Sequence, residues 1–100
     1  MLKHLNISYK DIIHNLKLSC QIPDVVEAIA TQKIIAEAAQ EAGIKVSEEE
    51  LQQEGDRLRL EKKLVQAKDT WAWLKKHHLS LDDFEELANN NILSKKLANH

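Results

Sequence analysis

Few residues of this sequence could do chemistry, and the most conspicuous are two adjacent histidines followed by two adjacent aspartates. His77 and His78 precede Asp82 and Asp83, and imidazole and carboxylate groups are common ligands of zinc. Neighbouring residues on a helix point about 100° apart, so the two histidines would not converge on one ion as residues four apart would. We therefore expect no metal site and interpret the histidines as a helix end, where positive charge is favourable.

The one cysteine, Cys20, is the candidate nucleophile. A thiol needs a neighbouring base to become reactive, and His14 does not share its helix face at this spacing. A single cysteine also excludes an internal disulfide and a multi-cysteine zinc site. We expect a small, buried or half-buried side chain, no catalytic residue and no cofactor.

Charged residues are abundant but balanced. The net charge is −2, which gives no overall attraction to nucleic acid, and three lysine pairs are spread over different predicted helices. The acidic run Glu48–Glu50 is explained by a helix start, where negative charge is stabilising. We therefore expect no nucleic-acid partner and no cation site. The lysine pairs are Lys62-Lys63, Lys75-Lys76 and Lys95-Lys96.

Two tryptophans are the most informative side chains for binding. Trp71 and Trp73 lie two residues apart, so on one helix they face different directions. Either both pack in the core, or one enters the core while the other reaches a rim or a partner. The sequence leaves both alternatives open.

The elements that position these residues are predicted to be helices. Apolar residues make up 43% of the 100 residues and charged residues 30%, with two glycines and one proline. This composition suits one soluble helical domain over 1–100 and leaves few turn residues for a β fold. No apolar run reaches the roughly 20 residues of a membrane span. The first residues lack a signal-peptide core, so we expect a cytoplasmic protein with no membrane partner.

The segment from Ala42 to Leu51 predicts the end of one helix and the start of another. Gly43 suits the left-handed residue after a helix, and Ile44 the apolar residue that follows it. Ser47 and Glu50 form a capping box. The sequence therefore predicts that the two flanking helices form a long antiparallel hairpin.

The same capping pattern recurs at Ser8 with Asp11 and at Ser80 with Asp83. Asp69 is predicted as the N-cap of a short helix that contains both tryptophans. We thus predict an all-α fold of about five helices, with shorter helices packed around the hairpin and a short extended arm at Met1–Ile7. The predicted helices are about 9–18, about 24–42, one beginning after Ser47, one from about Thr70 to His77-His78, and one beginning after Ser80.

These turns, in this order, resemble the N-terminal helical domain of SurA-like chaperones and parvulin-type peptidylprolyl isomerases. The resemblance covers roughly residues 8–98. It rests on Ala28–Ala42 with the turn through Leu51, on the start Leu79–Phe84, and on the closing segment Ile92–Leu97. In that family an isomerase domain follows, and no segment here matches it. The resemblance therefore implies a module that binds unfolded or extended polypeptide and does not itself catalyse isomerisation.

A helical dimerisation or interaction module without a client is the alternative function. The family's helical domain is usually completed by a later helix, so the resemblance implies an open apolar groove here, which a second copy could fill as a homodimer. The candidate residues for binding a peptide or partner are Ile13, Leu16, Trp71, Trp73, Leu74, Phe84, Leu87 and Ile92.

Overall fold

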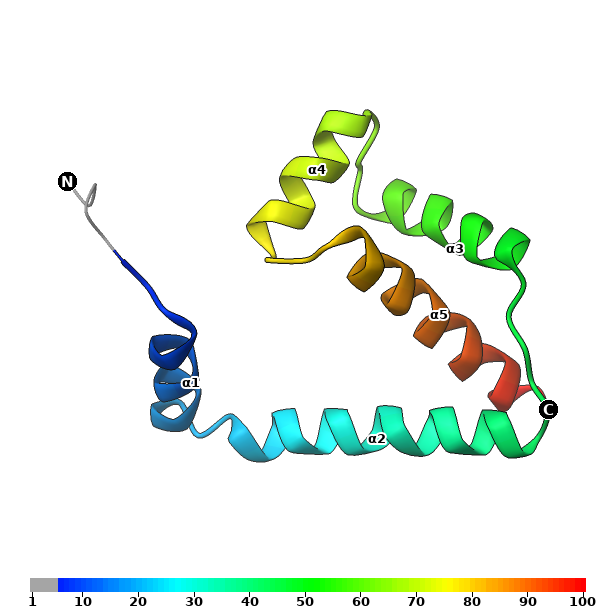
Figure 1. Ribbon diagram of the computed structural model, residues 1–100, viewed down its shortest axis with the longest axis horizontal. Coiled ribbons are helices and arrows are strands. Elements are labelled where there is room, and N and C mark those ends of the chain that lie inside the picture. The colour runs from blue at the N-terminus through cyan, green and yellow to red at the C-terminus, as the bar shows by residue number, and fades with distance from the viewer. Residues whose placement is uncertain (1–5) are drawn as a thin grey trace. The chain divides into compact units, whose positions relative to one another are not determined.

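A computed structural model describes residues 6–100 (Figure 1). Within this range 76% of the residues are helical and no strand is formed, so the all-α prediction is confirmed. The predicted extended arm lies mostly in residues 1–5, outside the described residues. The helices of the described part are α1 (Tyr9–Leu18), α2 (Ile22–Glu41), α3 (Glu48–Glu61), α4 (Ala67–Lys76) and α5 (Leu81–Ala98).

All three predicted capping boxes are formed. The Ser8 hydroxyl accepts a hydrogen bond from the Asp11 amide at 3.2 Å, and the Asp11 carboxylate accepts one from the Ser8 amide at 3.0 Å. Ser47 with Glu50 and Ser80 with Asp83 repeat this exchange before α3 and α5. Because each box joins residues only three apart, local sequence is sufficient to specify these helix starts.

Four helices end in the same way, with one left-handed residue after the last turn. Gly43 has a φ of 71° and follows α2, as predicted, whereas Cys20, Lys63 and His78 take this conformation after α1, α3 and α4. The Gly43 amide donates a hydrogen bond to the Gln40 carbonyl, and the Ile44 amide donates one to the Ala39 carbonyl at 2.9 Å. These paired bonds satisfy carbonyls that the end of a helix otherwise leaves free.

The boundary between α3 and α4 was predicted wrongly. The sequence predicted a helix from about Thr70 with Asp69 as its N-cap, but α3 ends at Glu61 and α4 begins at Ala67. Asp69 is the third residue of α4, and its carboxylate accepts a hydrogen bond from the Gln66 amide at 2.9 Å. The left-handed residue that ends α3 is Lys63, so no glycine marks this turn.

Gly43→Val is expected to lower the free energy of unfolding by about 1–2 kcal/mol, because an L-residue with a Cβ is strained at positive φ. A Cβ on Gly43 would meet no atom within 4 Å, so the loss would report backbone strain alone. Urea denaturation followed by circular dichroism measures it. Lys63→Gly is the matched control and should be stabilising, since it relieves the same strain at a φ of 59°. A neutral Gly43→Val would contradict the assigned helix end.

The chain divides into two compact units, residues 1–33 and 34–100. The first contains α1 and the beginning of α2, and none of its described residues is buried. The apolar side chains Tyr9, Ile12 and Ile13 are all at least 40% exposed. The described residues of this unit therefore form no hydrophobic core of their own.

The second unit is built on the antiparallel pairing of α3 with α5, which lie side by side (Figure 1). Lys96 near the end of α5 binds Glu50 at the start of α3, at 2.7 Å, and also donates to the Lys45 carbonyl at 2.8 Å. The core between α3, α4 and α5 is small. Its buried members are Leu58, Leu74, Phe84 and Ala88, with Leu51, Trp73, Leu79 and Leu87 packed against them.

The predicted hairpin of α2 and α3 is not confirmed, since the extensive helix pairing is that of α3 with α5. In α2 only Ala39 is buried among the described residues.

A buried carboxylate links the paired helices. Glu54 of α3 is 6% exposed, accepts two bonds from Arg57 at 2.6 and 2.9 Å, and accepts one from Asn91 of α5 at 3.2 Å. Lys95 lies 3.6 Å away. Hydrogen bonds from Arg57 and, to a smaller extent, from Asn91 lower the pKa of Glu54 from 4.5 to about 2, although its burial acts in the opposite direction.

Candidate functional site

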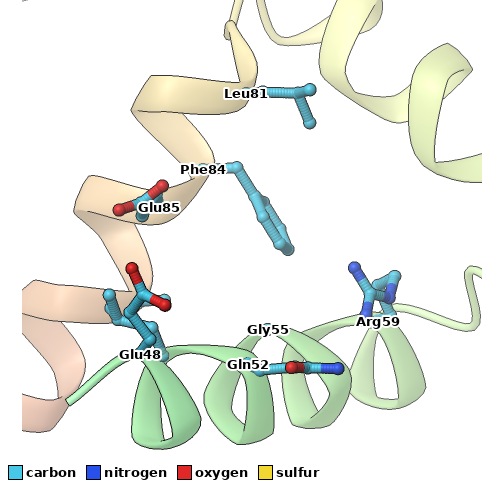
Figure 2. A pocket seen from close by; sticks show the side chains of 9 residues that line it. Glu48, Gln52, Gly55, Arg59, Leu81, Phe84 and Glu85 are labelled. Atoms are coloured by element: carbon cyan, nitrogen blue, oxygen red, sulfur yellow. The ribbon is translucent and has the colours of Figure 1, made fainter.

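A shallow groove of about 430 Å³ runs between α3 and α5, and we call it the central groove (Figure 2). Its floor is apolar and its flanks are polar. The Phe84 ring points from α5 toward α3, and its Cε2 atom would lie 3.6 Å from a Cβ on Gly55. Because Gly55 has no side chain, the space between α3 and the Phe84 ring stays open and forms part of the groove. The lining residues are Glu48, Leu51, Gln52, Gly55, Arg59, Leu81, Phe84, Glu85 and Ala88.

An acidic shelf adjoins the central groove. This depression of about 330 Å³ is lined by Leu51, Asp82, Glu85, Glu86 and Asn89, so it shares Leu51 and Glu85 with the groove. None of its carboxylates forms an ion pair with any residue in 6–100. The shelf therefore places three carboxylates that form no ion pair with the described residues beside an apolar floor.

An apolar corner adjoins the groove through Arg59 and Leu81, which line both depressions. This third depression, of about 350 Å³, also has Val65 and Trp71 on its lining. Both side chains are strongly exposed, Trp71 at 57% and Val65 at 88%. The full lining is Arg59, Leu64, Val65, Gln66, Ala67, Thr70, Trp71 and Leu81.

Thr70 adds a polar group to the apolar corner. It is 9% exposed, and its hydroxyl has no hydrogen-bond partner among the described residues. A buried hydroxyl without a partner is costly. The corner thus combines an apolar rim with one unsatisfied polar atom.

The two tryptophans lie in different surroundings, as their spacing suggested. Trp73 is half-buried and packs edge-on to Phe84 with ring centroids 6.1 Å apart. Its ring also lies 4.7 Å from that of His77, and the Lys62 ammonium lies 5.3 Å from its centre. Trp71 is the exposed member, which leaves it available to a partner.

The other predicted binding residues are divided between the core and the surface. Leu74, Phe84 and Ile92 are buried at 2%, 7% and 8% exposure, and Leu87 packs half-buried against the core. These side chains hold α3, α4 and α5 together, and of the four only Phe84 lines the central groove. Structural packing is therefore their observed role.

Ile13 and Leu16 belong to α1 in the first unit and are not part of these depressions. Ile13 is 47% exposed and Leu16 is half-buried. Sequence reasoning missed the groove residues Gly55 and Glu85 and the corner residue Val65. A glycine within a helix was a detectable signal for close approach, whereas no sequence signal placed Val65 beside Trp71.

The histidines, aspartates and cysteine that the sequence offers for chemistry are not assembled into a metal site in the described part of the chain. Within residues 6–100 no cluster of three or more His, Cys, Asp or Glu side chains could hold a metal ion. Cys20 is exposed, so the expectation of a buried or half-buried thiol was wrong. It lies directly after α1, in the unit in which none of the described residues is buried. No described helix combines the length and apolar character needed to cross a bilayer.

Comparison of the chain with protein-family models, with curated proteins and with solved structures gives no match.

Proposed function

We propose that the chain is a polypeptide-binding module of the chaperone type, which binds unfolded or extended segments without catalysis by its own residues. The observation that carries this proposal is the exposed Trp71 at the edge of the apolar corner. Tryptophan is prominent among residues that dominate binding energy, and exposed apolar patches mark interaction surfaces. An apolar side chain of a client would pack against Trp71, Val65 and Leu81.

The continuity of the depressions supports a client of several residues. The apolar corner joins the central groove through Arg59 and Leu81, and the central groove joins the acidic shelf through Leu51 and Glu85. A polypeptide could therefore contact all three in succession. The corner would hold an apolar side chain while the groove accommodates the segment beside it.

The resemblance to SurA-like chaperones and parvulin-type isomerases supports the same proposal. The two capped helix starts on which it partly rests, at Ser47 and Ser80, are formed in the structure. The SurA-like arrangement, with a long α2–α3 hairpin, is part of this proposal.

The test is binding of a fluorescently labelled, permanently unfolded test protein, with suppression of its aggregation as a second readout. Trp71→Ala is expected to weaken binding about tenfold, the loss typical of an interface anchor. Leu60→Ala is the matched control, because Leu60 is 81% exposed but lines none of the three depressions. Equal affinities of the two variants, or no binding by the unmodified chain, would refute the proposal.

A homodimerisation module is the second candidate, favoured by the uncovered apolar side chains of α1 and the start of α2. Ile12, Leu18, Val26 and Ile29 are between 40% and 70% exposed, and a stable dimer buries about 800 Å² per partner. Light scattering at tens of micromolar distinguishes a dimer from a monomer of 11.5 kDa. A monomer that suppresses aggregation would favour the polypeptide-binding function over this alternative.

A further inference from the structure

We propose that the acidic shelf selects clients in which lysine or arginine flanks an apolar side chain. This inference rests on the proposed function, because it names the class of polypeptide that the same surface prefers. The apolar side chain would occupy the apolar corner or the central groove, and the basic residue would reach Asp82, Glu85 and Glu86.

The shelf carboxylates are available to a client. The ion pairs of the described residues use Glu50, Glu54, Asp56 and Glu61. The shelf side chains take no part in these pairs, and Asp82, Glu85 and Glu86 are all exposed. A cationic side chain that approaches the shelf would therefore break no ion pair of residues 6–100.

The charge of the continuous surface is complementary to a basic client. Glu48 and Glu85 line the central groove itself, so its flank is acidic as well. The basic group on its lining is Arg59, whose guanidinium is bound to Asp56 on the same helix. Opposite charges at the rim favour a basic client, and like charges discourage an acidic one.

The carboxylates of the shelf lie next to apolar surface. Leu51 lines both the shelf and the central groove, as does Glu85. A lysine or arginine can lay its apolar stem along such a floor while its charged end reaches the rim. The preferred client therefore has its basic residue close in sequence to its apolar residue.

Two labelled probe peptides test this selection by fluorescence anisotropy. Both have a leucine–phenylalanine–leucine core, which is flanked by lysines in the basic probe and by glutamates in the acidic probe. At low salt the basic probe is expected to bind about tenfold more tightly, as a few rim charges can provide. In 1 M salt, where charges are screened beyond about 3 Å, this preference should largely disappear.

The double variant Glu85→Lys/Glu86→Lys should abolish or reverse the preference. Glu37→Lys/Glu41→Lys is the matched control: it makes the same change in net charge at exposed positions of α2 that line none of the three depressions, and it should retain the preference. Circular dichroism of both double variants verifies that they are folded. A preference that survives Glu85→Lys/Glu86→Lys would overturn the inference.

Failure of this inference can be separated from failure of the proposed function. If both probes bind equally well and Trp71→Ala weakens both, the polypeptide-binding function stands and the selection for basic clients is refuted. If neither probe binds and the unfolded test protein is not bound, both are refuted.

Discussion

Phe84→Ala is expected to lower the free energy of unfolding by about 3–5 kcal/mol, the usual loss for a buried phenylalanine. The Phe84 side chain is 7% exposed and belongs to the core cluster with Leu58, Leu74 and Ala88. Its removal would also end the edge-on contact with Trp73. Because a domain of this size has only about 5–15 kcal/mol of total stability, the variant should be close to unfolded.

Urea denaturation followed by circular dichroism measures this loss. Leu81→Ala is the matched control, because Leu81 lines the same groove but is 54% exposed, so its removal should cost less than about 1 kcal/mol. A loss below 1 kcal/mol for Phe84→Ala would show that the ring is not part of the core.

This expected instability also decides which variants can test binding. Phe84 and Leu74 were predicted as binding residues, but both lie in the core, so their alanine variants would lose binding through unfolding. Trp71 is exposed at 57%, and its replacement should leave the fold intact. Loss of binding in Trp71→Ala therefore reports on the surface itself.

Helix starts could be predicted from the sequence because their determinants are local. Ser47 and Glu50 exchange hydrogen bonds across three residues, so the pattern is visible in any short window. Helix ends are less strictly specified: Gly43 marks the end of α2, whereas no glycine marks the end of α3, and the boundary between α3 and α4 was predicted wrongly. Lys63 and His78 take the same conformation, and each is followed by a half-buried leucine, Leu64 or Leu79. We infer that packing of these leucines favours a left-handed residue at helix ends that have no glycine.

Helix partners could not be predicted in the same way. An apolar stripe at 3.6-residue spacing shows that a face is buried but does not say against which helix. The sequence paired the helices that flank Gly43, whereas the extensive pairing joins α3 to α5. The hydrogen bond between Glu54 and Asn91 spans 37 residues, and neither residue type indicates burial by itself. The groove depends on this pairing, so the sequence did not predict which residues would line it together.

Glu54→Gln is the second variant for which a large loss is expected, of about 1.5–3 kcal/mol near neutral pH. Hydrogen bonds to charged groups are worth this much, and those of Glu54 are largely shielded from water. Glutamine can retain one hydrogen bond to Asn91 or Arg57 but not the charge. Arg57 is 45% exposed and is also bound to Glu61 at 2.7 Å, so it would not be left as a buried unpaired charge.

The loss should depend on pH in a definite direction. The pKa of Glu54 is lowered from 4.5 to about 2 in the folded chain, so its ionised form stabilises the fold above pH 4.5 and this contribution disappears as the pH falls through about 2. Glutamine does not titrate. The difference between the unmodified chain and Glu54→Gln should therefore be constant above about pH 5 and shrink steadily toward pH 2.

Urea denaturation at a series of pH values between 2 and 7 measures this difference. The pKa values of Asp11 and Glu50 are also lowered, by hydrogen bonds from Ser8 and Lys96 respectively, but both groups are present in both proteins and cancel. Glu61→Gln is the matched control: it also removes a carboxylate from Arg57, but at a side chain 54% exposed, where the loss should stay below about 1 kcal/mol. If the two variants were equally stable at every pH, Glu54 would not join α3 to α5 as an ionised group.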